Sequence, residues 1–308
     1  MSAEERPGRV AVTSVSIDLG AGRRGVDMGP SAVRIAGLSA QVEGLGYELI
    51  ETGTVHAQAP ETTERGDARA KYLGEITDVA RRTRALVRRG LEDGCFPLVL
   101  GGDHSLSIGS VAAMAEFYRE RGESIGLLWV DAHADLNTPE TTPSGNIHGM
   151  SLAVLLGMGP TELTSVGGVE PSVRSEHVCV LGARDLDPPE REVIRETGVR
   201  VFTMTEVDER GIAACMREAI ERMTDGTAGF VVSYDLDGVD PMVAPGVGTP
   251  VPGGLTYREA HLILETAART GHLLGLEVVE VNPVLDDGNR TAKVAVGLIG
   301  SGLGKTIL

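Results

Sequence analysis

The sequence predicts an α/β fold in which helices cover both faces of a mostly parallel β-sheet. Short apolar runs bounded by turn residues alternate with segments of helical periodicity along all 308 residues, which is the pattern of repeated strand–helix–strand units. The runs are rich in Val and Leu, as in PLVL before Gly101 and IGLLWV before Asp131, which is typical of buried strands. No Pro/Gly/Ser linker divides the chain, so we expect one domain over residues 1–308.

Eight strands are expected, each at a short apolar run. They lie near residues 9–18, 47–51, 97–101, 125–131, 177–182, 199–203, 229–235 and 274–281. The first expected helix has Pro30 in its first turn, where the missing amide hydrogen is tolerated, and Thr256 with Glu259 has the spacing of a capping box before another helix. The expected helices cover 30–44, 69–92, 107–121, 188–197, 208–223, 256–270 and 291–303.

Composition limits the class of protein. There are 28 basic and 44 acidic residues, a formal charge of −16, which argues against a nucleic-acid partner because such proteins usually carry a basic patch. The three cysteines are widely spaced and suggest neither a disulfide framework nor a thiolate metal site. The charged N-terminus lacks a signal-peptide core, and no apolar stretch is long enough to span a membrane. We therefore expect a cytoplasmic protein.

Candidate metal ligands follow three of the predicted strands. The sequences are GGDH at 101–104, DAHAD at 131–135 and DLD at 235–237, and they offer His104, Asp131, His133, Asp135, Asp235 and Asp237. Parallel strands deliver their carboxyl ends to one edge of a sheet, where ligands bind. Residues two apart share one face of an extended chain, so each run can direct two donors at one point. A single Asp-x-Asp is more often a turn or a helix cap, but three clusters with two histidines favour a metal site.

Electrostatics predicts cations among these side chains. Two carboxylates about 4 Å apart repel by roughly 4 kcal/mol at an effective dielectric constant near 20. Two divalent ions would neutralise four such charges, and six ligands suffice if some carboxylates bridge. Carboxylate and imidazole donors without a thiolate favour a hard ion. Mn²⁺ fits best, although iron, cobalt and zinc accept the same donors.

The chain resembles the arginase and agmatinase (ureohydrolase) family over nearly its whole length. The matching segments, in order, are RGVDMGPSAVR at 24–34, GGDHS at 101–105, DAHADLNTPETTPSGNIHGM at 131–150, RDLDPPE at 184–190, SYDLDGVDP at 233–241, GTPVPGGLTYRE at 248–259 and EVNP at 280–283. The resemblance implies a three-layer α/β/α fold around an eight-stranded, mostly parallel sheet. It also implies a centre of two Mn²⁺ ions that hydrolyses L-arginine to L-ornithine and urea through a hydroxide bridging the ions.

Carried over by position, the resemblance also assigns roles in catalysis. It places His104 and Asp135 on one ion and His133 and Asp237 on the other, with Asp131 and Asp235 bridging. Glu280 would pair with the guanidinium of the substrate, since a planar fork and a carboxylate match each other. Asp135 would relay a proton to the leaving amine, and His148, a histidine and so of near-neutral reference pKa, would exchange protons with solvent.

The resemblance further implies how the amino-acid end of the substrate is bound. Asn137 and Ser144 would hold the α-carboxylate, with Thr142 acting through water, and Asp187 would face the α-amino group. Glu190 would assist Asp187, and Thr249 would lie near the guanidino nitrogens. Agmatine lacks the carboxylate, so the SGNxHG sequence favours arginine as the substrate.

Alternative interpretations remain at this stage. A sister hydrolase acting on agmatine or another guanidino compound would share the metal site, and a regulatory or binding homologue would lack a ligand or Glu280, which this chain retains. GAGRRG at 20–25 spells a dinucleotide fingerprint, but the predicted helix starts too late for it; a flexible loop at the active-site rim is the better interpretation. GSGLGKT at 300–306 has the wrong spacing for a phosphate-binding loop. Ser151 replaces a proline common in the family, which could loosen its loop. The resemblance also implies a homo-oligomer, a trimer or hexamer.

Overall fold

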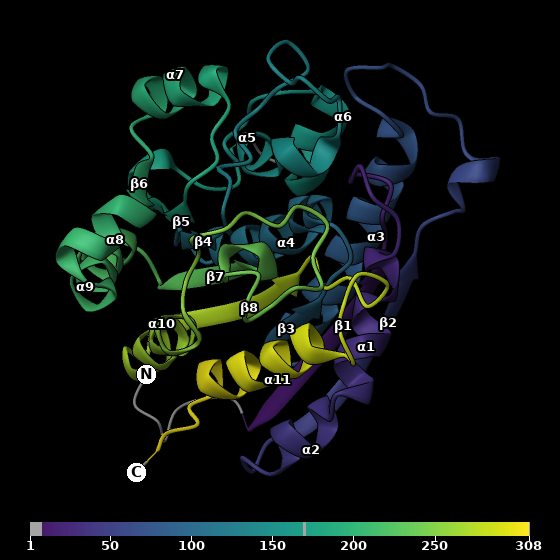
Figure 1. Cartoon of the computed structure of the whole chain (residues 1–308). Coiled ribbons are helices and arrows are strands. Elements are labelled where there is room, and N and C mark those ends of the chain that lie inside the picture. Colours follow the sequence, from purple (N-terminus) through teal and green to yellow (C-terminus); the bar gives the residue numbers. More distant parts are fainter. Residues whose placement is uncertain (1–7, 169–170, 308) are drawn as a thin grey trace.

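The computed structural model describes residues 8–168 and 171–307; residues 1–7, where no signal peptide was expected, lie outside them. All eight predicted strands are confirmed, and they form one sheet in the order β2-β1-β3-β8-β7-β4-β5-β6 (Figure 1). Every pairing is parallel. The strands are β1 Arg9–Ser16, β2 Glu48–His56, β3 Phe96–Leu100, β4 Gly126–Val130, β5 Val178–Ala183, β6 Arg200–Thr203, β7 Phe230–Asp235 and β8 Leu273–Val279.

Helices cover both faces of this sheet, giving the three layers that were expected (Figure 1). Successive residues of a strand point to opposite faces, so in β4 Leu128 and Val130 join one hydrophobic core while Leu127 and Trp129 join the other. The first core is closed by α1 Gly29–Ile35, α2 Leu38–Glu43, α8 Met204–Arg210, α9 Ile212–Thr224, α10 Tyr257–Arg269 and α11 Arg290–Gly302. The second core is closed by α3 Leu73–Glu92, α4 Ser107–Arg119, α5 Ser151–Leu155, α6 Thr161–Thr164 and α7 Pro188–Thr197.

Two segments that were each predicted to form one continuous helix form two helices instead. The segment expected as one helix over 30–44 is divided into α1 and α2 at Gly37, which has φ 105°. The segment expected over 208–223 begins earlier and is divided into α8 and α9 at Gly211, with φ 76°. Glycine adopts this left-handed region without the steric penalty of a side chain, so it allows the chain to turn between two helices. The short helices α5 and α6 were not predicted.

Strand order explains why distant sequence motifs meet. In the centre of the sheet the order is β3-β8-β7-β4, and these four strands precede His104, Glu280, Asp235 and Asp131. Since all four are parallel, their carboxyl ends lie at one edge. The topology therefore brings together motifs that are up to 176 residues apart, as in the contact between His104 and Glu280.

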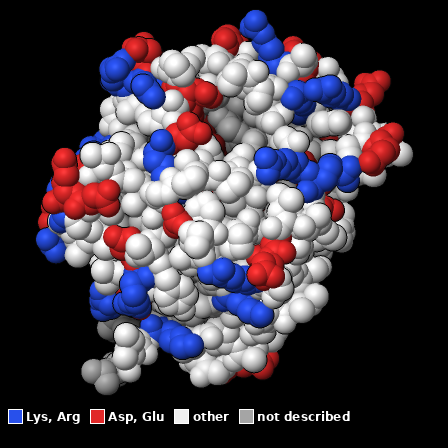
Figure 2. Space-filling model, viewed as in Figure 1, with Lys and Arg blue, Asp and Glu red and all other residues white. Residues whose placement is uncertain are grey.

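Surface features agree with the composition. Acidic and basic side chains are interspersed over the face seen in Figure 2. Cys95, Cys179 and Cys215 are all buried free thiols. Within the described part of the chain, no helix combines the length and apolar character needed to cross a bilayer.

The contact between α3 and α4 leads to a first prediction. A Cβ atom built on Gly109 in α4 would lie 2.2 Å from the carbonyl oxygen of Ala80 in α3, whereas a Cβ on Gly74, also in α3, meets nothing within 4 Å. We expect Gly109→Ala to lower the free energy of unfolding by about 1–3 kcal/mol because the helices must separate. Gly74→Ala, the matched control, should leave it unchanged or raise it by up to about 1 kcal/mol. Urea denaturation of both variants measures this, and equal stabilities would contradict the close packing.

Candidate metal centre and active site

One group of ligand atoms surrounds the imidazole of His104. Its Nδ1 lies 3.1 Å from Asp131 Oδ2, 3.2 Å from Asp135 Oδ2 and 3.1 Å from Asp235 Oδ2, and His104 is 1% exposed. The other ring nitrogen, Nε2, lies 2.8 Å from the hydroxyl of Ser233. No hydrogen bond satisfies Nδ1. One proton could not serve three oxygens at once, so this arrangement is that of a coordination shell.

A second group lies beside it and shares Asp131. Nδ1 of His133 is 3.3 Å from Asp131 Oδ1 and 3.1 Å from Asp237 Oδ2. Asp131 therefore presents one oxygen to His104 and the other to His133, which is how a carboxylate bridges two ions. In each group, one ligand atom of every residue lies close enough to the others to share a metal ion. The groups are His104, Asp131 and Asp135, and Asp131, His133 and Asp237. The structure thus brings together all six side chains predicted as ligands.

The protonation behaviour of these groups supports a cation at this position. Burial, together with the negative charge of Asp131, raises the pKa of Asp135 to about 6. Burial and the charges of Asp237 and Asp131 also raise the pKa of Asp235 well above its usual value. Removing water weakens the solvation of each charge, and neighbouring carboxylates add repulsion. Positive charge among these oxygens would relieve both effects, so the residues present fit two divalent ions.

The surrounding chain fixes the orientation of the ligands. The indole Nε1–H of Trp129 donates to Asp131 Oδ2 at 3.0 Å, and the ring of Trp129 stacks on His104 with centroids 3.9 Å apart. The hydroxyl of Thr249 donates to Asp237 Oδ2 at 2.8 Å. Such outer contacts hold ligands in one rotamer and tune the bound metal. Sequence reasoning missed Trp129 and Ser233, although each lies two residues before a predicted ligand on the same strand.

Glu280 contacts this cluster through the backbone of His104. It is 1% exposed, and its Oε1 accepts the backbone N–H of His104 at 3.0 Å and lies 3.0 Å from His148 Nδ1. Its Oε2 is buried and has no hydrogen-bond partner among the described residues. A buried carboxylate oxygen without a donor is costly, so Glu280 is prepared to receive a donor from a ligand.

Two residues of the cluster have strained backbones. Glu280 has φ 64° and Asp135 has φ 52°, a region that residues with a side chain seldom adopt. Each such residue costs of the order of 1–3 kcal/mol, and strain of this kind is concentrated at functional sites. Here it turns the two carboxylates toward the cluster at the ends of the chain segments that carry them.

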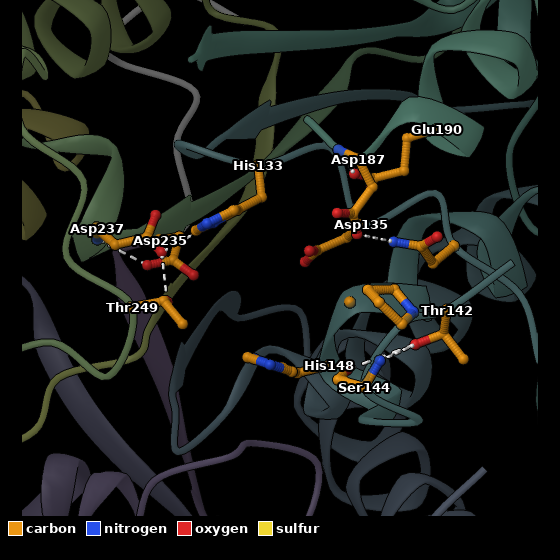
Figure 3. Close-up of a pocket in the computed structure, with 13 residues that line it drawn as sticks. His133, Asp135, Thr142, Ser144, His148, Asp187, Glu190, Asp235, Asp237 and Thr249 are labelled. Carbon is orange, nitrogen blue, oxygen red and sulfur yellow. Dashed lines mark hydrogen bonds and ion pairs between the residues drawn. The ribbon is translucent and has the colours of Figure 1, made fainter. Parts of the chain in front are cut away.

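A cavity of about 120 Å³ opens beside the cluster (Figure 3). Its walls contain every residue predicted to bind substrate, namely Asn137, Thr142, Ser144, Asp187, Glu190 and Thr249. His133, Asp235, Asp237 and Thr249 lie on one side of it, and Thr142 and Ser144 lie on the other (Figure 3). The same cavity is lined by His148, so one space connects the predicted recognition residues with the ligand cluster.

Hydrogen bonds order the walls of this cavity. The amide nitrogen of Asn137 donates to Asp187 Oδ2 at 2.9 Å. Glu190 accepts the backbone N–H of Asp187 at 2.9 Å and that of Leu136 at 3.1 Å, and it forms a capping box with Asp187 at the start of α7. Burial raises the pKa of Glu190 to about 7. Glu190 therefore supports the wall mainly by bonding its backbone.

The rim loop at 20–25 is held by a residue that the sequence analysis overlooked. Asp103 is fully buried, and it accepts the backbone N–H of Gly20 at 2.8 Å. The carbonyl of Gly20 in turn accepts the backbone N–H of His148 at 3.1 Å. The α-helix after this loop begins only at Gly29, so the glycines do not open a helix and the rim-loop interpretation stands. Asp103 is next to a predicted ligand in the sequence, which was its only signal.

Ser151 does not loosen its loop in the structure. It is buried at the start of α5, and its hydroxyl donates to the carbonyl of His148 at 2.9 Å. A proline could not make this bond, because it lacks the hydroxyl.

Comparisons of sequence and of structure match this chain to arginases over almost its full length. The family model described as "Arginase family" matches residues 8–304. The arginase of Bacillus caldovelox is 47% identical over 300 residues, covering 97% of this chain and 99% of the relative. The arginase of Brevibacillus brevis is 47% identical with the same coverage. The crystal structure of the arginase from Bacillus cereus superimposes with a TM-score of 0.90 at 46% identity, over 97% of this chain and 99% of the other.

The shared carboxylate of Asp131 leads to a prediction about metal content. Wild-type protein with added Mn²⁺ should hold two ions per chain and gain about 2.7 kcal/mol per ion, about 5.4 kcal/mol in all, in its free energy of unfolding when free metal is 100 times the Kd of each site. Asp131→Asn should lose at least one ion and most of that gain, because this side chain serves both groups. Elemental analysis and thermal unfolding with metal or chelator measure the two effects. Asp208→Asn, an exposed change in α8, is the control; if both variants bound two ions, Asp131 would not be a ligand.

Proposed function

This chain belongs to the arginase family, and we propose on that premise how it hydrolyses L-arginine to L-ornithine and urea. One observation carries the proposal: the Oε2 of Glu280 is buried and unpaired, and the Oε1 of the same side chain is bonded to the backbone of His104, a member of the ligand cluster. A guanidinium is always protonated and offers donors in a planar fork. A buried, unpartnered carboxylate oxygen at this position suits that fork.

The chain offers ligands for two divalent ions. We propose that His104 and Asp135 hold one ion, that His133 and Asp237 hold the other, and that Asp131 and Asp235 bridge them. Four carboxylates and two imidazoles favour Mn²⁺. When bound, such ions lower the pKa of a shared water from about 16 to about 7 and so supply a nucleophile at neutral pH.

Glu280 then determines where the substrate carbon lies. Its Oε1 is committed to His104 N–H and His148, so the guanidinium pairs through the free Oε2. Thr249, whose hydroxyl contacts Asp237, lines the same lobe as Glu280 and would lie near the guanidino nitrogens. Fixing the reacting groups in this geometry contributes to the rate by removing the entropy of alignment.

Two residues transfer protons in the proposed reaction. Asp135, whose Oδ2 lies in the ligand cluster, would accept a proton from the attacking water and deliver it to the amine that leaves as ornithine. For His148, burial acts to lower the pKa, but the hydrogen bond and charge of Glu280 raise it to about 9. The side chain of His148 is 17% exposed, so it reaches solvent and can return protons between the site and bulk water.

The other end of the cavity recognises the amino acid. We propose that Asn137 and Ser144, which line the cavity, donate to the α-carboxylate, with Thr142 acting through water. Asp187, held by Asn137, accepts from the α-amino group, and Glu190 fixes the backbone of Asp187. Donors for a carboxylate would serve no purpose with agmatine, and they therefore favour arginine over that alternative.

Further aspects of the proposal follow from family membership. We infer a single catalytic domain over residues 1–308, a cytoplasmic location, and assembly into a homo-oligomer, either a trimer or a hexamer. The small molecule L-arginine is the partner, and neither nucleic acid nor a membrane is involved. A regulatory homologue would be expected to lack a ligand, and all six are present in this chain.

Urea release tests the function directly. Protein loaded with Mn²⁺ should release urea from L-arginine with kcat/KM at least about 100-fold above that for agmatine. The reason is that agmatine has no carboxylate, so its binding would bury the α-carboxylate donors without a partner. Chelator should abolish activity, and added Mn²⁺ should restore it. Release from agmatine alone would contradict arginine as the substrate, and release from neither would favour a binding protein.

Glu280→Gln tests the pairing with the guanidinium. Glutamine keeps the shape but offers one neutral acceptor, so kcat/KM for L-arginine should fall at least about 100-fold, equivalent to ~2.7 kcal/mol. Both metal ions should remain, since Glu280 is not a proposed ligand. Steady-state kinetics and elemental analysis measure the two expectations, with Glu196→Gln on the exposed face of α7 as the control. Activity close to wild type would show that Glu280 does not hold the substrate.

A further inference from the structure

One lysine lies behind the loop that carries the carboxylate-binding residues. The ammonium of Lys71 donates to the side-chain oxygen of Asn146 at 2.8 Å. The backbone N–H of Lys71 also donates to the carbonyl of Gly145 at 3.0 Å. Lys71 thus contacts two consecutive residues of the SGN sequence, and it does so from a segment about 75 residues earlier in the chain.

This contact is sterically fixed. Gly145 has φ 73°, and a Cβ atom built on it would lie 1.8 Å from the carbonyl oxygen of Ala68. Only glycine allows the two backbones to come so close. The segment that ends at Lys71 is therefore packed tightly against the loop, which holds the ammonium at a constant position relative to Ser144.

The ammonium determines which way the amide of Asn146 points. An ammonium has donors only, so Oδ1 of Asn146 must face Lys71 and Nδ2 must face away. Nδ2 is 3.0 Å from the position that a Cβ on Gly22 would take. Gly22 and Asn146 line a second lobe of the active-site cleft together with His133 and His148. Asn146 also donates its backbone N–H to the hydroxyl of Ser144 at 3.2 Å, so the charge of Lys71 polarises a residue that is bonded to a proposed carboxylate donor.

The charge of this lysine matters because the cavity wall is acidic. Acidic residues in the wall of the cavity beside the ligand cluster include Asp135, Asp187 and Glu190, and neither Lys nor Arg lines it; Arg23 lines the second lobe. An α-carboxylate entering here meets neutral donors from Asn137 and Ser144. Burial lowers the pKa of Lys71, and the charge of Arg65 does so further; a bound anion would oppose both effects.

We propose that Lys71 is a specificity-determining residue that acts through Asn146 to favour guanidino compounds with an α-carboxylate. The inference rests on the proposed function and extends it. Arginine brings a carboxylate that the ammonium attracts through the polarised amide. Agmatine carries no anion and has an ammonium at its other end, so the same charge repels it. Lys71 touches neither the reacting atoms nor the ligands, and its effect belongs to substrate binding.

The test compares Lys71→Met with Lys71→Arg in the Mn²⁺-loaded enzyme. For Lys71→Met we expect KM for L-arginine to rise about tenfold, equivalent to ~1.4 kcal/mol, with kcat within about twofold of wild type. Ki of agmatine, measured as a competitive inhibitor of urea release, should stay the same or fall. Lys71→Arg keeps the charge and should recover most of the affinity for arginine. Lys293→Met is the matched control. It removes an exposed lysine in the first turn of α11, whose ammonium donates to the backbone carbonyl of Gly288.

Other outcomes would overturn the proposal. An unchanged KM in Lys71→Met would show that the charge is not felt by the substrate. Equal losses in Lys71→Met and Lys71→Arg, or a parallel rise in KM for arginine and Ki for agmatine, would show a purely structural role in the loop. If agmatine binds the wild type too weakly to measure, the KM values of the two variants decide. Failure of the proposed function is separate, because the wild type would then release no urea from arginine.

Discussion

Repulsion among buried carboxylates is the constraint on which the active site depends. Asp131, Asp135 and Asp235 each place an oxygen within 3.2 Å of one imidazole nitrogen, and each is at least 90% buried. Burial and mutual repulsion raise the pKa values of Asp135 and Asp235. Such a group is stable when cations lie among the oxygens. Metal ions bound here would therefore stabilise the fold at this edge of the sheet as well as supply the chemistry.

The rest of the molecule holds these side chains in fixed positions relative to one another. Four adjacent parallel strands set the distances between the ligand-bearing segments, and Trp129 and Ser233 fix the rotamers of Asp131 and His104. Backbone strain at Asp135 and Glu280 turns their carboxylates inward. A packed α/β scaffold can hold such strain because many contacts over-determine each position. Precise placement at the strand ends is the consequence.

Chemistry and selectivity are divided between two kinds of structure. The candidate metal ligands and Glu280 lie at or after the ends of strands in the centre of the sheet, whereas the residues proposed to recognise the amino acid lie on loops between residues 136 and 150 and at the start of α7. Hydrogen bonds from other loops hold these loops in place. Asp103 is hydrogen-bonded to Gly20, and Gly20 is hydrogen-bonded to His148. Lys71 is hydrogen-bonded to Asn146. Substrate preference can therefore change through residues that never touch the substrate, while the metal centre stays the same.

The sequence by itself determined the eight strands, because each is a short apolar run with turn residues at its ends. It also predicted the six candidate ligands, because three clusters of Asp and His follow buried strands; the expected extended alternation of Asp131, His133 and Asp135 is not what the structure has, since Asp135 has φ 52°. It did not determine the breaks at Gly37 and Gly211, since glycine within a periodic segment is compatible with either a continuous or a broken helix. Only the tertiary structure decided that Asp131 is shared by two histidines, that one oxygen of Glu280 is left free, and that Lys71 lies behind Asn146. These facts depend on contacts between segments far apart in the chain, and local patterns carry no information about such contacts.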